Sequence, residues 1–149
     1  MTSERFSFRA AVYLIAERDD QILLMRRFQT GWKDGFYTLP AGHLDGNESI
    51  AASMSRESLE EAGLIINPED LQVIHVVHQM SDHEYFDFYL RAKSWVGAPS
   101  ICEPEKCDHM DWFDRNKLPD NLLPNVRSAL ERISDGNLFS EFTNYDSHK

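Results

Sequence analysis

The sequence predicts an α/β or α+β layer fold with a mixed β-sheet. Runs rich in Val, Ile, Tyr and Phe, bounded by Gly, Pro, Asn and Asp, are typical of strands. Two other segments carry the start and stop signals of helices. Because strands come both before and after the first helix, we expect the helices and the sheet to pack as layers. A chain of 149 residues with 42% hydrophobic residues is long enough to form one domain, 1–149, with its core over about 6–136.

Six segments are predicted to be strands. They are residues 6–17, 21–28, 36–39, 71–80, 84–92 and 108–113. Asp19 and Asp20 form a turn after the first strand, and residues 81–83 form a turn between the fourth and the fifth. Pro40 and Gly42 end the third strand, because neither residue type supports a strand interior.

Residues 49–62 and 124–133 are predicted to be helices. Either Asn47 or Ser49 can cap the first helix, and Gly63 stands where a helix commonly ends in a left-handed residue. The second helix has a proline in its first turn and a glycine beyond its end.

The chain is acidic, with a net charge of −10 from 25 acidic and 15 basic residues. This charge argues against a broad electrostatic surface for DNA or for an anionic membrane. It does not exclude a small phosphorylated ligand, because a bound divalent metal can supply positive charge locally. An acidic surface also keeps a protein in solution, so the charge alone assigns no partner.

Cys102 and Cys107 form neither a disulfide framework nor a zinc-binding pattern. We therefore expect a reducing, cytoplasmic setting. The N-terminus lacks an apolar stretch of signal-peptide length, and no segment approaches the ~18 apolar residues of a membrane-spanning helix. The polar tail, 140–149, is expected to fray. The sequence leaves open whether the protein is a monomer or a homodimer.

Three acids of the first predicted helix share one face. Glu57, Glu60 and Glu61 fall within a sector roughly 100° wide at the helical period. The opposite side is predicted to face a sheet and carries mostly small residues: Ala51, Ser55, Ser58, Leu59 and Ala62. Like charges at this spacing cost a helix a few tenths of a kcal/mol per pair. The face is therefore either solvated or holds a cation, for which hard oxygen ligands suit Mg²⁺ or Mn²⁺.

Residues before the helix extend this pattern. The chain carries Gly42, five residues, Glu48, seven residues, Arg56-Glu57, two residues, Glu60-Glu61, one residue and Gly63-Leu64. This spacing resembles the Nudix signature, Gly-x5-Glu-x7-Arg-Glu-U-x-Glu-Glu-x-Gly-U, where U is a bulky apolar residue. Agreement at seven specified positions by chance is on the order of one in 10⁸ per starting point. Ser58 departs from the signature at the first U position, where we expect it to loosen packing.

The resemblance implies a mixed sheet sandwiched between helices. It also implies hydrolysis of a nucleoside diphosphate linked to another group X, with Mg²⁺ (or Mn²⁺) as cofactor. The implied metal ligands are Glu57, Glu60, Glu61 and the carbonyl of Gly42. Glu48 and Arg56 are implied to pair as structural residues, and Gly63 to end the helix.

The base that takes a proton from the attacking water lies, in many Nudix relatives, on a loop after the signature. The segment 102–107 precedes Trp112 and Phe113 and is similar to that loop in its placement. We expect Glu105 to act with Glu60 and Glu61 in catalysis, with Glu103 as the alternative to Glu105. Both loop acids are equally compatible with an ordinary polar loop.

Substrate contacts are expected near the loop 29–35. Strand alternation directs only one of Arg26 and Arg27 inward, and we favour Arg27 as a phosphate contact. Trp32 can stack on a base or pack in the core. Asn121, before the second helix, lies near where some relatives contact the nucleobase.

The resemblance favours a nucleoside triphosphate as substrate, cleaved to a monophosphate and pyrophosphate. This is an elimination. Relatives acting on ADP-ribose often carry a proline downstream of the signature, and residues 77–80 here contain none. Alternatives are a hydrolase of ADP-ribose or a nucleotide sugar, and a non-catalytic nucleotide-binding Nudix module. Such modules typically lose acids of the signature, all of which are present here. An isoprenoid diphosphate isomerase is disfavoured, because those chains are usually longer and depart from the signature.

Overall fold

Five strands form a mixed sheet in the computed structural model, which describes residues 4–143. They are β1 (Arg9–Ile15), β5 (Ala41–His43), β6 (Leu71–Met80), β7 (Glu84–Ala92) and β9 (Phe139–Thr143), in the order β5-β1-β7-β6-β9. β1 runs parallel to β7, and β9 parallel to β6. The other two pairings, β1 with β5 and β6 with β7, are antiparallel. The mixed sheet expected from the sequence is confirmed.

A second, smaller sheet is built around β3. It contains β2 (Glu17–Arg18), β3 (Gln21–Arg27), β4 (Tyr37–Thr38) and β8 (Cys107–Asp114). All three neighbours pair with β3 in the antiparallel sense. A short 3₁₀ helix, η1 (Pro68–Asp70), leads into β6.

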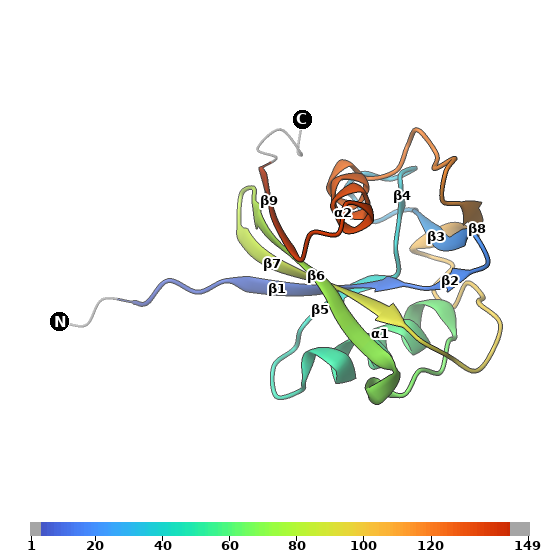
Figure 1. Ribbon diagram of the computed structural model, residues 1–149, viewed down its shortest axis with the longest axis horizontal. Coiled ribbons are helices and arrows are strands. Elements are labelled where there is room, and N and C mark those ends of the chain that lie inside the picture. Colours follow the sequence, from blue (N-terminus) through green and yellow to red (C-terminus); the bar gives the residue numbers. More distant parts are fainter. Residues whose placement is uncertain (1–3, 144–149) are drawn as a thin grey trace.

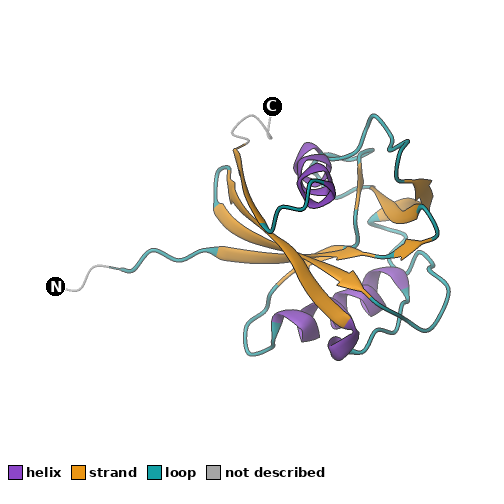
Figure 2. Cartoon of the chain, in the orientation of Figure 1, coloured by secondary structure: helices purple, strands orange, loops and turns teal. Residues whose placement is uncertain are grey.

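Two helices cover opposite faces of the five-stranded sheet, α1 (Ile50–Ala62) below it and α2 (Pro124–Ser134) above it in the view of Figure 1. Figure 2 shows the same layers by type of secondary structure. Alternation along β1 explains the arrangement, because successive side chains point to opposite faces. Val12 and Leu14 pack into the core cluster between the sheet and α1, and Ile15 packs into the cluster between the sheet and α2. Among the described residues, no helix is long and apolar enough to span a membrane.

The first helix has the ends that the sequence predicts. The Ser49 hydroxyl accepts a hydrogen bond from the Ala52 N–H (3.0 Å), which satisfies one of the free donors of the first turn. Gly63 ends the helix with φ of 70°, and its N–H donates to the Leu59 carbonyl. Ser58 is fully buried and donates its hydroxyl to the Met54 carbonyl (2.7 Å), so the helix itself satisfies the polar residue. Leu59 is 52% exposed, so its expected place on the sheet-facing side is wrong.

The strand expected over 6–17 is shorter and divided between two sheets. β1 begins at Arg9, and the pairing changes at Ala16, whose carbonyl accepts from the Leu23 N–H (3.0 Å). The chain then enters β2 in the smaller sheet. The strand expected over 36–39 contracts to β4, and the sequence did not predict β5, although Gly42 lies inside it.

The C-terminal tail is ordered where it was expected to fray. Residues 139–143 form β9, because β6 offers them a parallel partner. His75 adds a side-chain anchor: its ring nitrogens lie 2.9 Å from the Asn137 carbonyl and 2.8 Å from the Ser140 hydroxyl. The prediction of fraying over 140–143 is wrong, and its remainder, 144–149, lies outside the described residues.

Candidate active site

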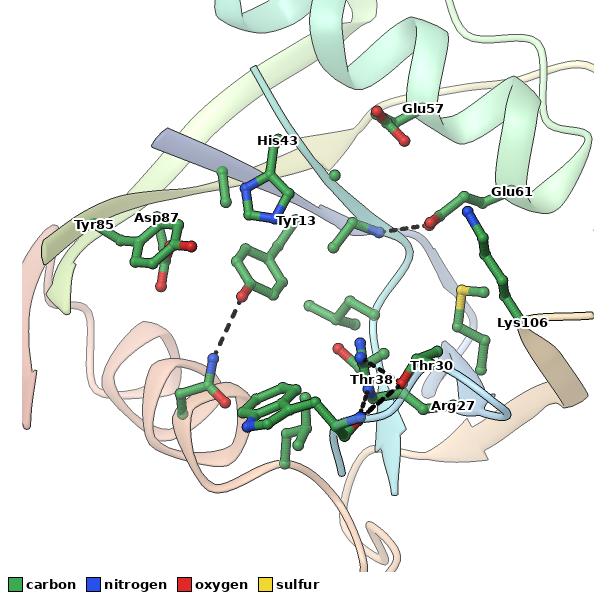
Figure 3. Close-up of a pocket in the computed structure, with 18 of the residues that line it drawn as sticks. Tyr13, Arg27, Thr30, Thr38, His43, Glu57, Glu61, Tyr85, Asp87 and Lys106 are labelled. Carbon is green, nitrogen blue, oxygen red and sulfur yellow. Dashed lines mark hydrogen bonds between the residues drawn. The ribbon is translucent and has the colours of Figure 1, made fainter. Parts of the chain in front are cut away.

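One large cavity lies at the meeting point of the two sheets and both helices. Its volume is about 840 Å³, within the range of small-molecule sites. Side chains from α1, β1, β3, β5, β7 and the start of α2 line it, together with the loop before β8. Figure 3 shows Glu57 and Glu61 on one side of the cavity, and Asp87 and Tyr85 on another.

Glu57 lies directly against Gly42. A Cβ atom on Gly42 would overlap the carboxyl carbon and both carboxylate oxygens of Glu57, so only glycine leaves room for this carboxylate. The Glu57 side chain is 13% exposed. Its burial raises its pKa, and the Arg56 guanidinium opposes that rise. The glycine and the first helix acid of the signature are therefore one packing unit.

Glu61 is held to the edge of β5. Its Oε1 accepts a hydrogen bond from the Ala41 N–H at 2.8 Å. Burial raises the pKa of Glu61 to about 8, and the nearby carboxylates of Glu57 and Glu103 add to the rise. The Ala41 N–H and Lys106 act in the opposite direction. Two partly buried acidic side chains thus lie close enough for Glu57 to raise the pKa of Glu61, an arrangement that favours a positive charge beside them.

Arg56 links the acids of the signature into one network. Its guanidinium lies 2.7 Å from Glu48, 2.9 Å from Glu57, 3.2 Å from Asp45 and 3.4 Å from Glu60. The contact with Arg56 lowers the pKa of Glu48. Glu60 also lines the cavity, but its side chain is 52% exposed. The Glu48–Arg56 pairing expected from the signature is present.

The loop before β8 is attached to the C-terminal end of α1. The Ser100 N–H donates to the Ala62 carbonyl (2.9 Å), and the Cys102 N–H lies 3.4 Å from the Glu61 carbonyl. These contacts supply donors to carbonyls that a helix end leaves without partners. Glu103, the next residue, is half-buried and lines the cavity. Glu105 is exposed and does not line it, because the turn over 103–107 directs it away.

Strand alternation separates the two arginines at the end of β3. Arg27 lines the cavity and donates to the Trp32 carbonyl (2.7 Å) and to the Thr30 hydroxyl (2.8 Å). Burial lowers the pKa of its guanidinium, which stacks 4.9 Å from the centre of the Trp32 ring. Arg26 pairs with Asp108 at 2.7 Å and does not line the cavity. The structure therefore brings Arg27 and Trp32 to the cavity wall.

Asn121 has a structural role. Its side-chain amide donates to the Gly35 carbonyl (2.7 Å), and its own carbonyl accepts from the Tyr37 N–H (2.8 Å). It does not line the cavity, whereas Asn125, the second residue of α2, does. The buried Asn125 amide lies 3.4 Å from the Tyr13 hydroxyl.

Asp87 is a cavity residue that sequence reasoning missed. It is 1% exposed, and its Oδ2 accepts from the Gln79 side chain at 2.6 Å. Burial raises its pKa to about 7. One signal was available in the sequence, since Asp87 is the only polar residue in the run Tyr85–Leu90 that is not aromatic. A charged residue in such a position is rare unless it is paired or functional.

The acids of α1 suit a hard divalent cation in their chemistry. Carboxylate and carbonyl oxygens are the ligands that Mg²⁺ prefers, and two of these carboxylates, Glu57 and Glu61, are partly buried and have raised pKa values. Within residues 4–143, no three His, Cys, Asp or Glu side chains are already gathered into a metal-binding group. Glu57 and Glu60 both accept from the same Arg56 nitrogen, at 2.9 and 3.4 Å.

Comparisons with known proteins show the family to which this chain belongs. The family model described as the NUDIX domain matches residues 7–133. The chain is 31% identical over 108 residues to the Nudix hydrolase YvcI of Bacillus subtilis, covering 70% of this chain and 65% of that protein. It is 30% identical over 112 residues to the human 8-oxo-dGDP phosphatase NUDT18, covering 75% of this chain and 33% of that protein. The chain thus spans less than two thirds of either relative.

A solved structure gives the same picture. The crystal structure of a MutT NUDIX hydrolase from Burkholderia pseudomallei superposes with a TM-score of 0.77 at 26% identity. The likeness covers 85% of this chain and 98% of that one.

Proposed function

Because this chain belongs to the Nudix hydrolase family, whose members act on pyrophosphate bonds, we propose that it is a Mg²⁺-dependent pyrophosphohydrolase of a nucleoside triphosphate. Its products would be the nucleoside monophosphate and pyrophosphate. One observation carries the proposal: Glu57, Glu60 and Glu61 line a nucleotide-sized cavity that also has Arg27 and Lys106 on its wall.

Glu57, Glu60 and Glu61, with the carbonyl of Gly42, would hold the metal. When bound, Mg²⁺ neutralises phosphate oxygens and lowers the pKa of water. The contribution of the chain is to keep the carboxylates at one place. Arg56 does so for Glu57 and Glu60, and the Ala41 N–H does so for Glu61.

The two cations on the cavity wall would orient the substrate. Arg27 is restrained by Thr30 and by the Trp32 carbonyl, so its guanidinium meets a phosphate with little loss of side-chain freedom. Lys106 lies close enough to Glu61 to lower the pKa of that carboxyl, which places a second positive charge at the acidic end. Trp32 would then lie beside the nucleoside.

A carboxylate at the cavity would take the proton of the attacking water. Glu103 is the better placed of the two loop acids, because it lines the cavity and raises the pKa of Glu61. Glu105 remains the alternative suggested by the spacing of the sequence.

A second candidate substrate is a nucleoside diphosphate. The likeness to a protein named 8-oxo-dGDP phosphatase supports it, and both substrates contain the same phosphoanhydride chemistry. ADP-ribose and nucleotide sugars stay as further alternatives within the family.

The test is a panel of nucleoside triphosphates, nucleoside diphosphates, ADP-ribose and nucleotide sugars, incubated with Mg²⁺ while phosphate and pyrophosphate are measured. We expect turnover of a triphosphate with release of pyrophosphate. Glu61→Gln is the inactive reference, and Glu69→Gln, an exposed acid of η1 outside the cavity, is the matched control. Nucleotide binding without turnover of any compound would contradict the proposal and indicate a binding module.

A further inference from the structure

The wall of the cavity away from the box acids, Glu57, Glu60 and Glu61, carries a buried carboxylate with one unused oxygen. Asp87 sits in the middle of β7, with Ala11 of β1 and Val77 of β6 as its neighbours across the sheet. Its Oδ2 accepts from Gln79, whereas its Oδ1 is buried and accepts no hydrogen bond within residues 4–143. Buried acceptors almost always have a donor, so this one requires an explanation.

A purely structural role explains Asp87 poorly. The Gln79–Asp87 contact is diagonal, since Gln79 faces Tyr85 and Asp87 faces Val77 in the strand register. A neutral side chain would make that contact without placing an ionisable group among aromatic residues. Asp87 is also one of the residues that line the cavity, so a ligand bound there is a candidate source of the missing donor.

The surroundings of Asp87 suit a flat, aromatic ligand. The Tyr13 ring stacks on the Tyr89 ring at 4.7 Å with an angle of 8° between them, and the Tyr13 hydroxyl reaches Asn125. Tyr85 and His43, whose rings lie 5.8 Å apart, stand on the same wall. Aromatic rings and amide groups of this kind are typical of nucleobase sites.

The geometry points to Asp87 as the residue that selects the nucleobase, and we propose that it accepts hydrogen bonds from a base edge with a ring N–H beside an amino group. This inference rests on the proposed function, because it requires a nucleotide with its phosphates at the box acids.

Hydrogen-bond chemistry restricts the base to the guanine class. Carboxylate oxygens only accept, and N1–H with the 2-amino group of guanine offers two donors on one edge. Adenine and cytosine place an unprotonated ring nitrogen next to their amino group, which would face the carboxylate lone pairs. Uracil and thymine flank their single N–H with two carbonyl oxygens. Because Asp87 is only 1% exposed, water competes weakly for it and a mismatched edge is rejected strongly.

The test measures binding without turnover. Dissociation constants for GMP, IMP and AMP are measured by calorimetry with Mg²⁺ at pH 8, above the raised pKa of Asp87. None of the three monophosphates has an anhydride bond that could be cleaved. IMP retains the ring N–H of GMP and lacks only the amino group, so the GMP-to-IMP ratio reports the proposed contact. We expect GMP to bind at least tenfold more tightly than IMP or AMP, and Asp87→Asn to bring the three within about twofold. Asp20→Asn, an exposed acid in the turn before β3, is the matched control and should keep the preference.

A second variant tests the inference independently, in case Asp87→Asn does not fold. Gln79→Met removes the amide that orients Asp87 and leaves the carboxylate, so it should reduce the preference for GMP by several-fold while circular dichroism stays unchanged. Equal binding of the three nucleotides by the unaltered protein, or a preference retained in Asp87→Asn, would overturn the inference. Hydrolysis without base preference would refute only the role of Asp87. Base preference without hydrolysis would refute only the proposed activity.

Discussion

The Glu57 carboxylate fills the space that any side chain on Gly42 would need. This contact joins the strand β5 to the middle of α1, across fifteen positions of the sequence. It explains a glycine in a strand, where that residue is normally unfavourable, by the close approach of another group.

Gly42→Ala should therefore displace Glu57 and reduce kcat/KM by about 10²-fold, because a misplacement near 1 Å has that effect on reacting groups. We expect only a small decrease in the melting temperature, so the loss of kcat/KM would not reflect unfolding. Steady-state kinetics and thermal unfolding check this. Gly136→Ala is the control, because Gly136 has a positive φ but open space around it, so it should lose stability and keep its rate. Full activity in Gly42→Ala would show that Glu57 has no role in catalysis.

Glu60→Gln and Glu61→Gln should each lower kcat by more than about 10²-fold. The glutamine at position 61 can still accept from the Ala41 N–H, and it removes a buried acid, so the free energy of unfolding at pH 8 should not decrease. Rates and chemical denaturation of each variant give the comparison. Near-full activity in either variant would remove that residue from the metal site.

Glu103→Gln and Glu105→Gln form a matched pair in one loop. Because only Glu103 lines the cavity, we expect Glu103→Gln to lower kcat at least tenfold and Glu105→Gln to stay within about twofold. The affinity for Mg²⁺, measured by calorimetry, should change little in either variant. The opposite ranking would restore Glu105 as the base.

Stability of the metal-free protein should fall as pH rises from about 4 to about 8. Asp87 and Glu61 have usual pKa values of 3.8 and 4.5, and burial raises them to about 7 and about 8 in the folded chain. The folded state thus binds more protons than the unfolded state across this window. The resulting contribution to the free energy of unfolding is fully present below the usual pKa values and is lost above the raised ones. Each contributes at most about 5 kcal/mol. Urea denaturation at pH 5 and pH 8 measures the change, and Asp87→Asn should flatten it. An equal slope in that variant would show that Asp87 does not titrate in this range.

Local signals allowed much of the fold to be predicted. The bounds of β6 and β7 agree with the expected strands 71–80 and 84–92, because turn residues enclose both. The helix α1 follows from Ser49 and Gly63, which satisfy its free backbone groups. β5 and β9 were missed because their stability comes from partners distant in the sequence. A strand of three residues containing Gly42 has no local signature.

The residues of the candidate site likewise fall into those that local sequence predicted and those that depend on contacts distant in the sequence. The spacing of the signature predicted that Glu57, Glu60 and Glu61 share one side of a helix, and all three line the cavity. The wall around Asp87 depends on β1 lying parallel to β7, which pairs Ala11 with Asp87 across 76 positions. Alternation predicted that only one of Arg26 and Arg27 points inward, and Arg27 is the one that lines the cavity. It carries no information on which loop acid, Glu103 or Glu105, meets the cavity, because turn geometry decides that.

The attachment of Ser100 and Cys102 to the last carbonyls of α1 has a consequence for local unfolding. Ser100 and Cys102 lie about forty residues beyond the end of α1, yet their backbone N–H groups contact its last carbonyls. Glu103 follows directly in the same segment. Opening of either segment exposes unpaired groups on the other, so the two should open as one cooperative unit. The Ser100 amide should then show the same protection from hydrogen exchange as the amides of the last turn of α1. The loop is thus a fixed wall of the site, unlike a lid that closes over substrate.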